Sequence, residues 1–367
     1  MIGNITICEY RKYNYGNIFQ NYAINHFFRK KKIEFKSIHC IASYLPGYLR
    51  ILFYQNFHIY VSNQLKVEKS DNLDLQRDRN FEKFIAENIK PKRYGWYSER
   101  TYRDINKRFG KVIVGSDQVW NPYFSSNKGK RTLLLGFLPP EKRISYAASF
   151  GISELPEQWK DLYRDALKDY RAISVREKEG AQIVKELTGR DVPVLIDPTM
   201  LLTVEDWRKV EKPSPARKGK NYILTYFLGE QSPECRKRIR KISQQHNLDV
   251  LELCDRSQPE EYVSGPSEFL DLFDHASLVF TDSFHATVFS ILFGKPFVVH
   301  NRIQEGMENM GSRITTLLKK LDLECRLPGR VSDDDLFWCD YQRAYELLEV
   351  ERQKAKDYLL RACTDET

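Results

Sequence analysis

The chain has 367 residues, of which 41% are hydrophobic and 29% charged, and its formal net charge at pH 7 is +8. This composition excludes a disordered or fibrous protein, and the length predicts two domains, because one hydrophobic core seldom fills so long a chain. Seven scattered cysteines without a C-x-x-C pair indicate neither a disulfide framework nor a zinc site. The N-terminal residues lack the apolar core of a signal peptide, and no segment reads as a transmembrane helix, so a cytoplasmic protein is expected.

Positive charge is concentrated in the first third of the chain, where residues 1–110 carry 20 Lys and Arg against 10 Asp and Glu. No DNA- or RNA-binding motif accompanies this excess, so nucleic acid is not expected as a partner. The excess surrounds an aromatic segment, Tyr44–Tyr60, which contains Arg50 and follows the basic region Arg29–Lys36. The charge excess predicts an anionic substrate, a membrane surface or plain solvated charge. The aromatic segment predicts either a surface that guides a membrane-proximal substrate through peripheral membrane contact, or a helical hairpin that buries the rings.

Short β-branched runs alternate with helical patterns through the first half of the chain, as in βα units around a parallel sheet. The predicted strands are Ile5–Cys8, Phe35–His39, Lys111–Val114, Ile144–Ala147, Ala172–Val175 and Val194–Ile196. The predicted helices are Asn17–Lys31, Leu73–Asn88, Pro156–Tyr170 and Glu177–Leu187. Glu211–Lys220 combines two prolines with charged residues and no apolar run, which is typical of a domain linker.

The same alternation resumes after this segment. The predicted strands are Tyr222–Phe227, Asp249–Leu253, Leu278–Thr281 and Pro296–Val299, and the predicted helices are Glu234–His246, Pro266–His275 and Ser283–Phe293. Ser332–Ala362 predicts one or two helices that pack back on the first domain. The sequence therefore predicts an α/β fold of two doubly wound Rossmann-like domains, residues 1–210 and 221–330, with a linker at 211–220 and a helical segment at 331–367. The carboxyl ends of the two sheets should face a shared cleft, where such folds bind ligands.

Two polar loops follow predicted strands of the first domain. In the loop Glu9–Asn17, a helix begins near Asn14, Gly16 and Asn17, where free backbone N–H groups suit an anion or a sugar hydroxyl. The loop after Lys111–Val114 carries a cluster that suits a sugar, namely Ser116, Asp117, Gln118, Trp120 and Asn121. In both loops the alternative is that these side chains only cap the following turn.

Two further junctions carry side chains suited to chemistry. Arg176 follows the strand Ala172–Val175 and is predicted either to bind an anion or to pair with Glu177 or Asp197. His285 lies in the first turn of the predicted helix Ser283–Phe293, facing the expected cleft. Histidine is the side chain best suited to proton transfer near neutral pH, so a functional role is favoured over a structural one.

These motifs together resemble the polysaccharide pyruvyl transferase family. The resemblance extends from Ile5 to about Leu321, and its most specific part is GSDQVWN (115–121) with TDSFHA (281–286). Supporting motifs are NYGN (14–17), SYAASFG (145–151), ISVRE (173–177), IDPT (196–199), GPSEFL (265–270) and SRITTLL (312–318). The resemblance implies a GT-B-like fold and transfer of a pyruvyl group from phosphoenolpyruvate onto a sugar of a cell-surface polysaccharide or its lipid-linked precursor, usually as a cyclic ketal.

The resemblance also implies roles for individual residues. The family's histidine matches His285, the expected proton carrier, whereas many members carry Arg two residues earlier, where this chain has Ser283. The donor is therefore expected to contact Ser283 and nearby cations, drawn from Arg176, Lys295, Arg302 and Arg313. Asp117 is expected to accept a proton from the acceptor or to hold its hydroxyls. The remaining acceptor contacts are expected from Asn14, Gly16, Asn17, Ser116, Gln118, Asn121 and a stacking face on Trp120.

Phosphoenolpyruvate is expected as a co-substrate, with no cofactor and no metal. Two alternatives use the same fold. The first is a GT-B glycosyltransferase that binds the diphosphate of a nucleotide sugar in the cleft. The second is a non-catalytic glycan-binding relative, which the presence of His285 and the polar loop at 115–121 disfavours. The sequence does not indicate an oligomeric state.

Overall fold

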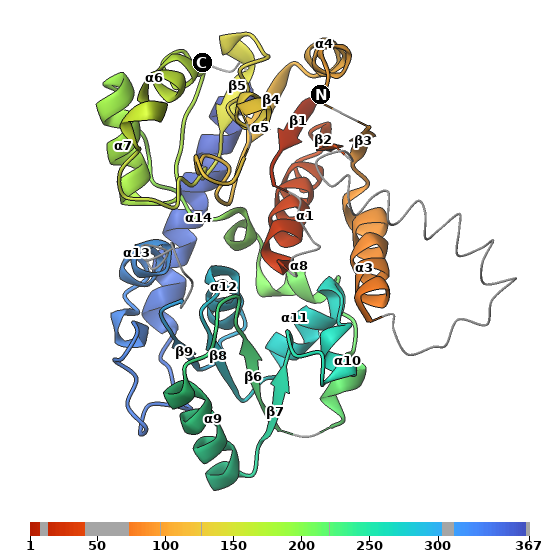
Figure 1. The fold of residues 1–367 in the computed structure, drawn as a ribbon, viewed down its shortest axis with the longest axis vertical. Coiled ribbons are helices and arrows are strands. Elements are labelled where there is room, and N and C mark those ends of the chain that lie inside the picture. The colour runs from red at the N-terminus through yellow and green to blue at the C-terminus, as the bar shows by residue number, and fades with distance from the viewer. Residues whose placement is uncertain are drawn as a thin grey trace, which may run out of the picture.

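The computed structural model describes residues 1–7, 14–40, 73–95, 97–125, 127–219, 221–302 and 312–364. The predicted aromatic segment Tyr44–Tyr60, with Arg50, lies outside the described residues, as does Cys8 at the end of the first predicted strand. The described chain contains two parallel sheets, one in the upper and one in the lower half of Figure 1. The predicted α/β fold of two doubly wound units is confirmed.

The first sheet has five parallel strands in the order β3-β2-β1-β4-β5. The strands are β1 (Ile2–Ile5), β2 (Phe35–Cys40), β3 (Lys92–Tyr94), β4 (Lys111–Val114) and β5 (Arg143–Ser145). The predicted strands Ala172–Val175 and Val194–Ile196 form only isolated parallel bridges beside β5. The Ser145 hydroxyl donates to Ser174 O, and the Ser174 hydroxyl accepts from Ala147 N, so side chains replace part of the strand ladder there.

The helices of this half are α1 (Tyr15–Lys30), α3 (Leu73–Phe84) continued by a π-turn (Ile85–Ile89), α4 (Glu99–Arg108), α5 (Asn127–Leu133), α6 (Glu157–Leu167), α7 (Lys178–Thr188) and α8 (Val204–Arg208). Among them, α4, α5 and α8 were not predicted, and α4 is the longest of the three. Its sequence ERTYRDINKR buries only Tyr102 and Ile105, too few apolar positions for a helical period, and its start is set by the Ser98 side chain, which accepts from Thr101 N.

The second sheet has the order β7-β6-β8-β9, with β6 (Tyr222–Tyr226), β7 (Asp249–Glu252), β8 (Leu278–Thr281) and β9 (Phe297–Val299). Its helices are α9 (Pro233–His246), α10 (Pro259–Tyr262), α11 (Pro266–Asp274), α12 (Phe284–Leu292) and α13 (Ser312–Lys320). All nine residues of α12 are buried, because FHATVFSIL is apolar or small on every side and the helix runs through the centre of the molecule.

The two halves share one continuous core. Tyr15 and Phe19 of α1 pack against Phe269 of α11 at ring distances of 4.4 and 5.2 Å, and Phe19 also contacts Phe289 of α12. The segment at 211–219 is packed as well, since Ser214 N donates to the Asp271 carboxylate on α11. The exact position of the domain boundary stays a prediction. In the sequence, the strands of the first sheet precede this segment and those of the second sheet follow it.

The C-terminal helix α14 (Gln342–Cys363) crosses from the second half to the first (Figure 1). Its Tyr345 hydroxyl donates to Ile291 O at the end of α12, while its Tyr358 hydroxyl donates to Ser145 O at the end of β5. The stretch at 332–341, which the sequence predicts as part of a helix, is not helical.

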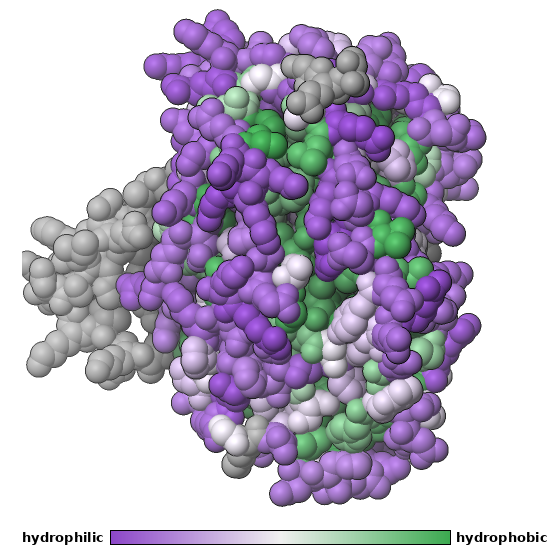
Figure 2. Space-filling model, turned by 180° about the vertical axis from the view of Figure 1, so that it is seen from behind, coloured by the Kyte–Doolittle hydropathy of each residue, from purple (hydrophilic) through white to green (hydrophobic). Residues whose placement is uncertain are grey.

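None of the helices among the described residues is both long enough and apolar enough to cross a membrane. The face seen in Figure 2 is mainly hydrophilic, with hydrophobic residues visible in separate patches between polar ones.

Candidate active site

Asp197 is the centre of a buried polar cluster where the carboxyl ends of β4 and β8 approach each other. Its Oδ1 accepts hydrogen bonds from the backbone N and the hydroxyl of Thr199, at 3.0 and 2.7 Å. Its Oδ2 accepts from Gln20 Nε2 at 2.7 Å, Arg176 at 2.7 Å and the Ser116 hydroxyl at 3.0 Å. Burial alone would raise the pKa of Asp197, but His285, Arg176 and these hydrogen bonds hold it well below its usual range. Asp197 is therefore a fixed negative charge.

His285 is held against this carboxylate from the opposite half of the molecule. It lies in the first turn of α12, and its Nε2 is 2.9 Å from Gln20 Nε2 and 3.7 Å from Asp197 Oδ2. The other edge of the ring lies on Gly16 in the first turn of α1, where an added Cβ would stand 1.9 Å from His285 Nδ1. Only glycine leaves room for the ring. The NYGN and TDSFHA motifs are thus in direct contact.

Two buried arginines lie beside this pair. Arg176 NH1 donates to Asp197, but its Nε and NH2 form no hydrogen bond with a described residue, and NH2 is 3.5 Å from Asp117 Oδ1. Arg313, from α13, forms no side-chain hydrogen bond within the described ranges, and its NH1 is 3.7 Å from the same Asp117 oxygen. Burial, with repulsion from Arg176, lowers the pKa of the Arg313 guanidinium to about 10, which leaves it charged at neutral pH. Asp117 therefore faces two cations with unused donors.

Asp117 follows β4 in the left-handed region, at φ 62°, which turns its carboxylate into the cluster. Glu177, next to Arg176, instead binds backbone, since its Oε1 accepts from the backbone N of Phe150 and Gly151. Burial raises the pKa of Glu177, against the attraction of both arginines. Of the two carboxylates predicted to pair with Arg176, Asp197 forms the ion pair and Glu177 binds backbone instead.

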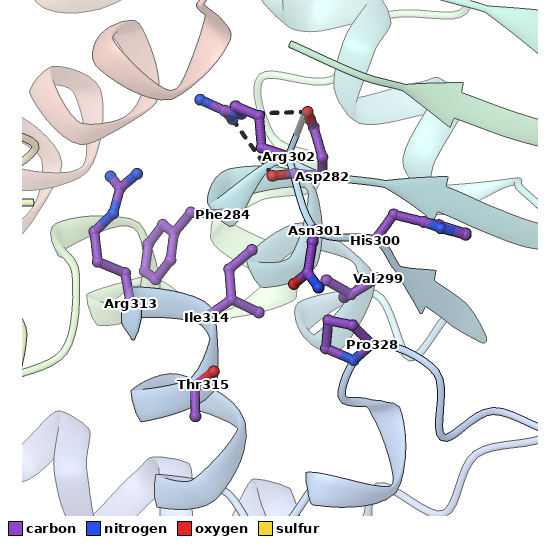
Figure 3. Close-up of a pocket in the computed structure, with 10 residues that line it drawn as sticks. All are labelled: Asp282, Phe284, Val299, His300, Asn301, Arg302, Arg313, Ile314, Thr315 and Pro328. Atoms are coloured by element: carbon purple, nitrogen blue, oxygen red, sulfur yellow. Dashed lines mark hydrogen bonds and ion pairs between the residues drawn. The ribbon is translucent and has the colours of Figure 1, made fainter. Parts of the chain in front are cut away.

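A cavity of about 50 Å³, lined by Arg313 but not by Arg176, lies at the carboxyl ends of β8 and β9 (Figure 3). Figure 3 shows the Arg302–Asp282 pair at one side of it and Arg313 with Phe284 at another. Arg302 lies 3.2 Å from Asp282, whose carboxylate also accepts from the backbone N of Leu228 and Gly229. The charge of Arg302 is thus largely compensated, whereas that of Arg313 is not. The cavity is lined by Asp282, Phe284, Val299, His300, Asn301, Arg302, Arg313, Ile314, Thr315 and Pro328.

The predicted acceptor residues fall into two groups. Ser116 lies in the cluster around Asp197, and Asn17 is buried near the start of α1 with its Oδ1 unbonded to any described residue. Asn14 instead caps α1 by accepting from Gly16 N. Gln118 and Asn121 bond to each other, Asn121 Nδ2 donating to Gln118 Oε1 at 2.9 Å. Whether these residues touch an acceptor stays a prediction.

Trp120 does not offer the predicted stacking face. Its ring is fully buried against Phe150 and Tyr170, and its Nε1 donates to Leu133 O. The large apolar ring completes the core under the loop, so burial outweighs exposure to a ligand.

Lys295 does not lie at the donor site, where it was predicted. It follows the C-terminal end of the nine-residue helix α12, whereas His285 lies in the first turn of that helix. Asp274 lies nearby and attracts the Lys295 ammonium. A lysine just after a helix lies at the amino edge of the next strand, away from the edge that carries ligands. Ser283, by contrast, lies at the right edge, but it is buried and its hydroxyl caps α12 at Ala286 N.

Gln20 was not predicted as a site residue. It lies one turn after Gly16 on α1, so the two residues share a face, but a single glutamine inside a predicted helix gives no signal of its own. Among the described residues, the one group with metal-ligand geometry is Glu211, Asp271 and His275, and Asp271 is already paired with Arg217 at 3.2 Å.

Two Rossmann-like units that meet at a buried polar site, with a C-terminal helix across both, define an α/β protein of the GT-B type. The family model for polysaccharide pyruvyl transferases matches residues 14–301, and the chain belongs to that family. No curated protein is significantly similar to it.

Solved structures give matches of low identity. UDP-GlcNAc 2-epimerase from Methanocaldococcus jannaschii, in complex with UDP-GlcNAc and UDP, is 12% identical over 95% of this chain and 99% of that chain, with a TM-score of 0.46. UDP-N-acetylglucosamine 2-epimerase from Rickettsia bellii is 9% identical over 98% and 96%, with a TM-score of 0.46. MurG from Acinetobacter baumannii is 9% identical over 99% and 98%, with a TM-score of 0.41. At such identities the likeness says nothing about what this chain binds.

Proposed function

We propose that the protein transfers a pyruvyl group from phosphoenolpyruvate to a sugar of a cell-surface polysaccharide or its lipid-linked precursor, forming a ketal. The observation that carries the proposal is the pair Arg176 and Arg313, two buried guanidinium groups with unbonded N–H donors that both lie near Asp117. Arg176 also shares the Asp197 carboxylate with His285. A buried, incompletely bonded cation is costly, and an anionic ligand removes that cost.

Phosphoenolpyruvate fits this pair in charge and in shape. It carries a carboxylate and a phosphate, and planar guanidinium groups bind both through paired hydrogen bonds. The positive end of α12, which begins at Phe284, lies at the same place and adds to the attraction. In this proposal Arg313 supplies the cation that many family members carry at the position of Ser283.

The reaction needs proton transfers that the cluster can provide. A proton delivered to the methylene carbon of phosphoenolpyruvate makes C2 electrophilic, and a sugar hydroxyl adds there as it loses its own proton. Phosphate then leaves, and a second hydroxyl adds to C2 as it loses its proton, which the released phosphate takes up, so that a ketal and inorganic phosphate are formed. His285 is the proposed proton carrier, and Asp117 either accepts the hydroxyl proton or holds the acceptor.

The test is release of inorganic phosphate from phosphoenolpyruvate that depends on a lipid-linked oligosaccharide acceptor, with mass spectrometry of the product. Thermal stabilisation by phosphoenolpyruvate and by UDP-sugars, measured separately, distinguishes the alternatives. Stabilisation by a UDP-sugar alone would replace this proposal with a glycosyltransferase, and stabilisation by the acceptor alone would indicate a glycan-binding protein. Sedimentation with anionic liposomes tests the proposed peripheral membrane contact on the cytoplasmic side.

A further inference from the structure

Groups from the first half of the chain contact both nitrogen-bearing edges of the His285 ring. Gly16 supports its Nδ1 edge, and Gln20 Nε2 lies 2.9 Å from its Nε2. The same Gln20 nitrogen lies 2.7 Å from Asp197 Oδ2. A single amide group therefore stands between a carboxylate and an imidazole, and all three are buried.

The orientation of this amide follows from its neighbours. If the amide were turned over, its oxygen would face the Asp197 carboxylate oxygen at hydrogen-bond distance, and the two would repel each other. The Gln20 nitrogen must therefore face Asp197, and its oxygen forms no hydrogen bond with a described residue. Because the amide nitrogen carries two hydrogens, one is donated to Asp197 and the other to His285 Nε2.

We propose that Gln20, oriented by Asp197, is a positioning residue that sets the tautomer of His285, keeping Nε2 as an acceptor and the proton of the neutral ring on Nδ1. The role in turnover rests on the proposed function. The carboxylate that orients the amide is itself fixed by Thr199, Ser116 and Arg176, so neither Gln20 nor the ring can rotate freely.

The charged groups of the cluster come from four segments of the chain. Asp197 lies 3.7 Å from the ring, Arg176 pairs with Asp197, Asp117 follows β4, and Arg313 stands on α13. The Gln20 amide nitrogen is engaged by Asp197 and His285 and not by either arginine, so its loss should leave the anion-binding groups in place. A change at Gln20 is therefore expected to act on proton transfer and not on donor binding.

The direct test is nuclear magnetic resonance of the full chain with 13C- and 15N-labelled histidine, in which the signals of His285 are assigned by their loss in His285→Asn. We expect the Nδ1–H tautomer in the wild-type protein and a shift toward the Nε2–H tautomer in Gln20→Met, which keeps the length of the side chain but donates no hydrogen bond. Gln182→Met, on the exposed face of α7, is the matched control. A wild-type Nε2–H tautomer would overturn the proposal, and this outcome requires no Gln20 variant.

The kinetic test is a loss of about 10²-fold in kcat for Gln20→Met with the KM for phosphoenolpyruvate unchanged, as expected when a reacting group is misplaced. Unchanged kcat and pH profile in a variant whose tautomer has shifted would remove the functional role. The tautomer measurement needs no substrate, so failure of pyruvyl transfer in every assay would overturn the proposed function while leaving the tautomer assignment to be judged separately.

Discussion

Arg77 and Arg313 are both buried arginines that join the two halves of the molecule, yet their surroundings differ. Arg77, on α3, donates to the backbone oxygens of Leu253 and Tyr262 and to the Tyr15 hydroxyl, at 2.7 to 3.1 Å, and its guanidinium stacks on aromatic rings. Arg313 has no comparable hydrogen bond within the described ranges and lies near a second cation, Arg176. A buried guanidinium that donates three hydrogen bonds to the chain is structural, whereas one that donates none within the described ranges is available to a ligand.

The largest expected effect is on the structural member of this comparison. Arg77→Met leaves two buried backbone oxygens and a tyrosine hydroxyl without their donor, and each such group costs ~1–3 kcal/mol. We expect the free energy of unfolding to fall by roughly 3 kcal/mol or more, measured by urea denaturation. A variant as stable as the wild type would show that Arg77 is not the link between the halves.

Arg313→Met should give the opposite pattern. Removing a desolvated, poorly paired cation is expected to leave the free energy of unfolding unchanged or to raise it by about 1 kcal/mol. Affinity for phosphoenolpyruvate should fall by about 10- to 100-fold, as for the loss of charge-assisted hydrogen bonds. Isothermal calorimetry measures this, with the exposed Arg330→Met as control. Unchanged affinity would contradict the assignment of Arg313 to the donor site.

These two arginines also show how far sequence could lead. The strands β4 and β8 were predicted to the residue, at Lys111–Val114 and Leu278–Thr281, because buried parallel strands are continuous apolar runs. The family and the fold class could also be predicted, because both depend on local patterns: short motifs at strand ends and apolar runs within strands. Arg313 could only be named as one cation among several, because its incomplete hydrogen bonding depends on how α13, Arg176 and Asp117 meet in space.

The misplaced residues have a related cause. Trp120 and Gln118 are near neighbours in one loop, but the backbone turn sends the Trp120 ring into the core, and residue type alone does not reveal this direction. Lys295 follows the same helix that carries His285 in its first turn, yet the length of that helix places the two residues at opposite ends. The prediction assumed that residues close in sequence to the site are also close to it in space, and this assumption was wrong for Trp120 and Lys295.

A smaller effect tests whether the donor site and the histidine are separable. In Gly16→Ala the new methyl group would overlap the His285 ring, which must move. We expect the free energy of unfolding to fall by ~1–3 kcal/mol and kcat to fall by about 10²-fold, with phosphoenolpyruvate still bound by the arginines. Gly110→Ala is the control, because an added Cβ there meets open space. Loss of donor binding in Gly16→Ala would mean that the ring itself holds the anion.

The smallest expected effect concerns Asp117, which occupies the two arginines at 3.5 and 3.7 Å. Asp117→Asn removes an anion that competes with the donor, so affinity for phosphoenolpyruvate should rise by roughly threefold to tenfold, as for ~1 kcal/mol of lost attraction. Turnover should fall, because the acceptor loses a partner. Calorimetry and steady-state kinetics on one preparation separate the two effects, and weaker donor binding would show that Asp117 supports the arginines instead of competing for them.

The path of α14 has a consequence for biosynthesis. The helix begins at Gln342, yet its Tyr358 hydroxyl bonds to Ser145 O at the edge of the first sheet, and Arg352 bonds to Met200 O. Ribosomal synthesis makes the strands of that sheet long before it makes the residues that cover their edge. Until the ribosome has synthesised α14, no part of that helix covers β5 and the bridges beside it. Nascent chains that stop before residue 342 should therefore expose this edge and bind chaperones, whereas the full-length protein should not bind them.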